Sequence, residues 1–140
     1  MIYLREIEVD IDILSHPILG PFFGDLCDFK PTEKADRRCA LLLNVYKKDC
    51  LRDLQSRIIV LKPRVIAGLP SDVCNYAKKN PTFPNESTAD QLFNEAQFES
   101  YRQLGLNIGQ MLFGHADAGD AKIAQALWAY LWPNESDTND

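Results

Sequence analysis

The stretch Glu6-Ile7-Glu8-Val9-Asp10-Ile11-Asp12-Ile13 gives the clearest indication of fold in this sequence. Apolar and acidic residues alternate along it without a break, and a period of two places one set on each face of a β-strand. The pattern predicts a strand over residues 5–14, with a buried apolar face and a row of carboxylates in solvent. Because a straight row cannot surround an ion, these carboxylates predict no metal site.

Two further strands are expected downstream, at residues 38–46 and 57–62. The first has a nearly continuous apolar run from Cys39 to Leu43, which is typical of a well-buried central strand. The second is rich in β-branched residues and ends before Pro63, which cannot donate to a ladder. No helical pattern separates the three strands, so an antiparallel arrangement is expected.

The pattern changes to helices after Pro70, with expected ranges of 71–79, 88–93, 95–113 and 119–132. Asn94 and Gln97 have capping-box spacing at the start of the longest helix. Gly105 and Gly109 lie four apart on it, and close packing on the sheet is expected there. The sequence therefore predicts one α+β domain over residues 1–133: a three-stranded antiparallel sheet followed by three to four helices packed on one face. The polar segment 134–140 is expected to be a mobile tail.

Composition is that of an ordinary globular domain, with 140 residues, 46% of them hydrophobic and 25% charged. No apolar run is long enough to span a bilayer and the start does not resemble a signal peptide, so a cytoplasmic location with four reduced cysteines is expected. None of the cysteines forms a C-x-x-C pair, which argues against zinc. Aromatic residues do not interleave with the basic ones, so no nucleic-acid partner is expected.

An ordered series of short motifs occupies the stretch from Ile58 to Gly105. The motifs are Lys62-Pro63 at a strand end, Asp72-Val73, Tyr76, PTFP at 81–84, ESTADQ at 86–91 and EAQFESYR at 95–102. In this order they resemble the C-terminal region of bacterial patatin-like phospholipase-family proteins, and the likeness extends over about residues 4–113. The loop at 66–70 departs from the more acidic, Thr-Gly-containing loop of that family, and Asn85 stands where the family has His.

The resemblance implies a link to lipid acyl hydrolysis, but the catalytic motifs of that family are absent. Patatin-like hydrolases use a Ser in a G-x-S-x-G elbow and an Asp in a D-G-G or D-G-A turn, and neither occurs in this sequence. The chain is therefore expected to be an accessory C-terminal domain or fragment without catalytic, cofactor or metal-binding residues of its own. Its expected partner is the patatin-like catalytic domain, on the same or a neighbouring polypeptide.

Two surfaces are candidates for binding. A polar cluster within the resembling stretch is the expected docking surface or rim of the substrate mouth: Asn85, Glu86, Ser87, Asp90, Glu95, Glu99 and Arg102. Helix capping and pairs such as Glu99 with Arg102 also account for these residues. A basic region is a candidate for contact with anionic lipid at a membrane periphery, or is simply a solvated strand face: Arg37, Arg38, Lys47, Lys48, Lys62 and Arg64.

Functions of two other classes remain open. One is a free-standing protein–protein interaction module with no role in lipid metabolism. The other is an independent enzyme, for which the two histidines, His16 and His115, are the candidate bases. His115 follows an expected helix end, where it interacts favourably with the helix dipole, so a structural role is favoured for it.

Overall fold

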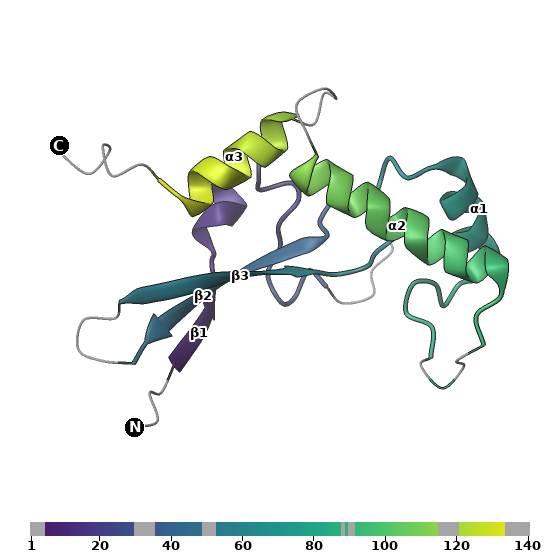
Figure 1. Cartoon of the computed structure of the whole chain (residues 1–140), viewed down its shortest axis with the longest axis horizontal. Coiled ribbons are helices and arrows are strands. Elements are labelled where there is room, and N and C mark those ends of the chain that lie inside the picture. The colour runs from purple at the N-terminus through teal and green to yellow at the C-terminus, as the bar shows by residue number, and fades with distance from the viewer. Residues whose placement is uncertain are drawn as a thin grey trace.

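The computed structural model describes residues 5–29, 36–48, 53–87, 89, 92–114 and 121–133. Three strands, β1 (Arg5–Val9), β2 (Ala40–Lys47) and β3 (Leu54–Leu61), form an antiparallel sheet in the order β1-β2-β3. Three α-helices follow: α1 (Ser71–Lys79), α2 (Glu95–Phe113) and α3 (Ala121–Leu131). Figure 1 shows α3 beside the sheet, with α1 and α2 extending away from it. The expected α+β class is confirmed.

The first strand is shorter than the expected 5–14. After Val9 the chain turns into a 3-10 helix, η1 (Asp12–Ser15). The cause is Asp10, whose Oδ1 accepts hydrogen bonds from the backbone N–H groups of Asp12 and Ile13, both at 3.1 Å. An aspartate side chain that binds nearby backbone in this way competes with the ladder. Asp10 is itself buried, so the expectation of a fully solvated acidic row is wrong at this residue.

The two faces of the sheet have different surroundings. Leu42 and its cross-strand neighbour Ile59 point toward the helices and belong to the hydrophobic core. The core continues through Leu104 and Leu112 of α2 and Leu127 of α3, all almost fully buried. Side chains alternate along a strand, so the residues between these point to the opposite, outer face. There Ile7, Ile58 and Val60 are 57%, 43% and 40% exposed.

Helix α2 begins as expected, with the Asn94 side chain accepting a hydrogen bond of 2.8 Å from the Gln97 N–H. The expectation for its two glycines is wrong, because a Cβ built on Gly105 or Gly109 meets nothing within 4 Å. Neither residue packs on the sheet. Half of the expected helix at 88–93 falls on residues outside the described part, and its described residues, Ala89, Leu92 and Phe93, are not helical.

The remaining boundaries differ little from expectation. Helix α3 spans Ala121–Leu131 where 119–132 was expected, and the segment 134–140 lies outside the described residues. Within the part of the chain that the structure describes, no helix is long and apolar enough to cross a membrane.

Candidate functional site

A buried polar network ties the sheet to α3. The Asp10 carboxylate accepts hydrogen bonds from Asn44 Nδ2 at 3.0 Å and from the Tyr130 hydroxyl at 2.8 Å. Arg57 donates from Nε to Asn44 Oδ1 at 3.2 Å and from a terminal nitrogen to the Leu131 carbonyl oxygen at 2.6 Å. Burial and the adjacent carboxylate of Asp10 raise the pKa of Tyr130. Among the described residues no buried side-chain nitrogen or oxygen lacks a partner, and these bonds hold α3 on the sheet.

Glu86, from the expected docking cluster, is used inside the domain. Its carboxylate accepts a hydrogen bond of 2.6 Å from Gln97 Nε2 on α2. It also lies beside Tyr76 and Tyr101. Burial raises the pKa of both tyrosines, and this carboxylate raises both further, while a backbone hydrogen bond with Glu86 partly offsets the rise at Tyr101. Phe83 packs edge-on between these two rings, with centroid distances of 5.2 and 4.8 Å. Glu86 therefore anchors the loop before α2 from a partly buried position.

Three members of the expected cluster do share one surface, the outward side of α2. Glu95 and Glu99 lie one helical turn apart, and Glu99 forms a bidentate ion pair with Arg102, with both hydrogen bonds at 2.7 Å. Hydrogen bonds from Arg102 and then Gln103 hold the pKa of Glu99 at about 2. Because the pair is half-exposed, it contributes little to folding stability.

Large apolar side chains lie on the same side of α2: Phe98 and Leu106 flank the ion pair, and Phe113 lies about 16 Å beyond Arg102 along the helix. Phe98, Leu106 and Phe113 are 62%, 43% and 43% exposed, at helical spacings that bring them to the outward side of α2. We call this surface the outer face of α2; its residues are Glu95, Phe98, Glu99, Arg102, Leu106 and Phe113. Exposed apolar residues with polar residues at their margin are typical of interaction surfaces.

The other members of the cluster are not part of this face. Asn85 and Ser87 are exposed in the loop before α2, where the Ser87 hydroxyl accepts a hydrogen bond of 3.2 Å from the Ala89 N–H. Asp90 lies outside the described residues. The six predicted positions that the structure describes therefore divide between an internal anchor, a loop and the outer face of α2.

The six basic residues are also divided. Arg38 and Arg64 lie near the start of β2, where Arg38 pairs with Asp28 at 2.7 Å and Arg64 with Asp36 at 3.1 Å. Lys62 lies at this end too, with its N–H bonded to the Cys39 carbonyl oxygen, and Arg37 lies over the Phe22 ring. Lys47 and Lys48 lie at the far end of the strand, seven residues further along. The six basic residues therefore form two separate groups, one at each end of β2.

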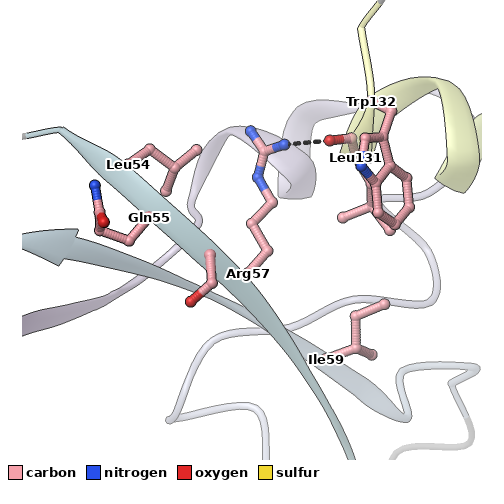
Figure 2. A pocket seen from close by; sticks show the side chains of 7 residues that line it. Leu54, Gln55, Arg57, Ile59, Leu131 and Trp132 are labelled. Atoms are coloured by element: carbon pink, nitrogen blue, oxygen red, sulfur yellow. Dashed lines mark hydrogen bonds between the residues drawn. The ribbon is translucent and has the colours of Figure 1, made fainter.

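A hollow of about 540 Å³ lies between the edge of β3 and the end of α3. Figure 2 shows Arg57 extending across it from β3 to the Leu131 carbonyl. Its other lining residues are Leu54, Gln55, Ser56, Ile59 and Trp132. Trp132 is 63% exposed and stacks on Trp128, with ring centroids 4.7 Å apart. The spacing of four between these tryptophans was the available signal for this surface, and the sequence reasoning missed it.

The Cys39 thiol and the His16 imidazole are held in environments that fit a structural role. Burial raises the pKa of the Cys39 thiol to about 12, so at neutral pH it is protonated and a poor nucleophile. His16 accepts hydrogen bonds at Nδ1 from the N–H groups of Ile18 and Leu19. Within the described residues, no group of three or more His, Cys, Asp and Glu side chains is arranged to hold a metal ion. His115 lies outside that part of the chain.

Comparison with known proteins returned no match: no family model, no curated protein and no solved structure corresponds to this chain.

Proposed function

We propose that this chain is a non-catalytic docking domain that binds a larger partner protein through the outer face of α2. The observation that carries this proposal is the exposure of Phe98 and Leu106 beside the Glu99–Arg102 pair, with Phe113 exposed further along the same side of the helix. Burying these side chains against a partner supplies about 25 cal/mol for each Å² of apolar surface removed from water. The charged pair would then fix the orientation of the partner.

The specific partner proposed is a patatin-like lipid acyl hydrolase domain. Support for this partner comes from the ordered motifs between Lys62 and Arg102, two of which, at 86–91 and 95–102, lead into α2 or form its first turns. The chain would shape or dock the catalytic domain, which would supply the nucleophile that this sequence lacks. A cytoplasmic location, with peripheral contact to an anionic membrane surface, belongs to the same proposal.

The direct test is co-expression with any upstream reading frame that encodes a G-x-S-x-G motif. We expect the two proteins to co-purify, and Phe98→Lys combined with Leu106→Lys to reduce recovery of the complex at least tenfold. Ile7→Lys is the matched control, because Ile7 is 57% exposed on the sheet, far from α2 in the chain, and should leave recovery unchanged.

Fatty-acid release from lipid esters separates the roles of the two proteins. The isolated chain should give no turnover, and the hydrolase should change activity when the chain is added. Two results together would contradict the proposed partner: a genomic neighbourhood without a reading frame for a hydrolase, and stable folding of this chain alone. They would favour a free-standing interaction module. Turnover by the chain alone, abolished by one of its own substitutions, would contradict a non-catalytic role.

A further inference from the structure

Strand β3 has one row of backbone hydrogen-bonding groups that no described residue pairs. The Lys62 N–H donates to the Cys39 carbonyl oxygen at 2.8 Å, which makes the facing residues Ala40 and Leu61 a non-hydrogen-bonded pair. Such pairs alternate with hydrogen-bonded ones along an antiparallel ladder. The backbone groups of Arg57, Ile59 and Leu61 therefore point away from β2. Since β3 is at the end of the sheet order, these groups lie on an open edge.

The two edges of the sheet differ in how well they are protected. The edge strand β1 has five residues, three of them charged, and charges on an edge oppose the addition of another strand. Strand β3 has eight residues and one charge, Arg57, whose guanidinium group is already bound to Asn44 and to the Leu131 carbonyl. Leu54, Ile58, Val60 and Leu61 are each about 40% exposed along it. A bulge leaves Gln55 without a facing residue on β2, so the regular part of this edge runs from Ser56 to Leu61. An apolar edge of this kind is a template for strand pairing.

We propose that two copies of this chain associate through antiparallel pairing of β3 with β3, across a two-fold axis at Ile58. Charge favours a second copy as the occupant, because Asp53 precedes the strand and Lys62 follows it. Antiparallel pairing brings the acidic start of each strand near the basic end of the other, twice in the dimer. An axis at Ile58 also places Arg57 opposite Ile59 of the second copy, whereas an axis at Arg57 would oppose two arginines.

In this pairing, side chains of the second copy would lie over the hollow beside β3. With the axis at Ile58, Leu61 of the second copy lies opposite Gln55, and its Ile59 lies opposite Arg57. Both side chains point to the helix side, where the hollow of about 540 Å³ lies between β3 and Trp132 (Figure 2). Each copy would cover the hollow of the other with Leu61, which is 42% exposed, while Ile59 stays packed against its own core. On the outer face the two Ile58 side chains would meet at the axis.

The first test measures mass in solution by light scattering for three proteins. The wild type should have the mass of two chains, and Ile58→Lys should have the mass of one, because two ammonium groups would face each other at the axis. Ile7→Lys is the matched control on the same sheet face at the opposite edge, and it should remain a dimer. Circular dichroism establishes that both variants are folded. A monomeric wild type, a dimeric Ile58→Lys, or dissociation by Ile7→Lys would each overturn the proposal.

The second test checks the register by disulfide formation, in a background with serine at positions 27, 50 and 74. Ile58→Cys places two thiols in a facing non-hydrogen-bonded pair, close enough to bond, and oxidation should give a covalent dimer. Val60→Cys is the control, because in this register two residues at position 60 are about 13 Å apart along the strands. Equal cross-linking of both variants, or cross-linking of Val60→Cys alone, would overturn the assigned axis.

Discussion

Asp10 is the residue on which several elements converge. Its carboxylate accepts hydrogen bonds from two backbone N–H groups of η1, from Asn44 of β2 and from Tyr130 of α3. It ends β1, starts η1 and holds α3 at the same time. A carboxylate buried to this extent is tolerated because its oxygens have four donors. The part of the network easiest to remove without leaving a gap is the Tyr130 hydroxyl.

We expect Tyr130→Phe to lower the free energy of unfolding by roughly 1.5–3 kcal/mol at pH 7, the usual range for a hydrogen bond to a charged group. The ring and its packing remain, so the loss reports the bond to Asp10. Chemical denaturation of both proteins measures it. Trp128→Phe is a control on an exposed ring of the same helix and should have a small effect. Equal stabilities of Tyr130→Phe and wild type would contradict a structural role for this bond.

The same pair of proteins carries a pH prediction. The folded-state pKa of Tyr130 is raised above its ordinary value of about 10. Its contribution to stability is therefore complete below pH 10 and is lost as the pH rises toward the folded-state pKa. The difference in unfolding free energy between wild type and Tyr130→Phe should shrink above about pH 10. A difference that stays constant through that range would argue against the assigned environment.

Helix α2 contains a position where stability can be gained. Gly105 is in the middle of the helix, exposed, and without neighbours around an added Cβ. Gly105→Ala should raise the free energy of unfolding by about 0.5–1 kcal/mol, because alanine loses less backbone entropy on entering a helix. Gly20→Ala is the opposite control, since its Cβ would lie 2.5 Å from the Leu14 carbonyl oxygen. Thermal unfolding measures both, and a destabilised Gly105→Ala would indicate a neighbour at this face.

Across the whole molecule, the six basic residues lie in two groups at the two ends of β2. If these groups bind lipid, binding should depend on the charge of the vesicle and on salt. We expect a preference for anionic over neutral vesicles in co-sedimentation, weakening at high salt, with each accessible basic group adding up to about 1 kcal/mol. Lys48→Gln should reduce binding more than Arg38→Gln, because Asp28 already neutralises Arg38. Equal sedimentation with neutral vesicles would remove the membrane part of the proposed function.

Local patterns predicted the elements well where local physics decides them. The β-branched run at 58–60, the cap formed by Asn94 and the spacing along α2 are all short-range features, and the structure has them where they were expected. The end of β1 was missed because the sequence alternates in the same way whether the strand continues or the Asp10 side chain binds the backbone and ends the ladder. The outer face of α2 was partly predicted through Glu95, Glu99 and Arg102, but its apolar members were not.

By itself, the sequence determined the elements of this protein, their order and its α+β class, since alternation, caps and breakers act over a few residues. Only the tertiary structure decided which polar side chains form hydrogen bonds within the domain. Glu86 binds Gln97, and Arg57 reaches Leu131 across 74 positions of the chain. It also decided that β1 and β3 are the two edge strands of the sheet and that β3 is the more apolar of them. Partners so distant in sequence meet through packing of the core, which no short pattern encodes.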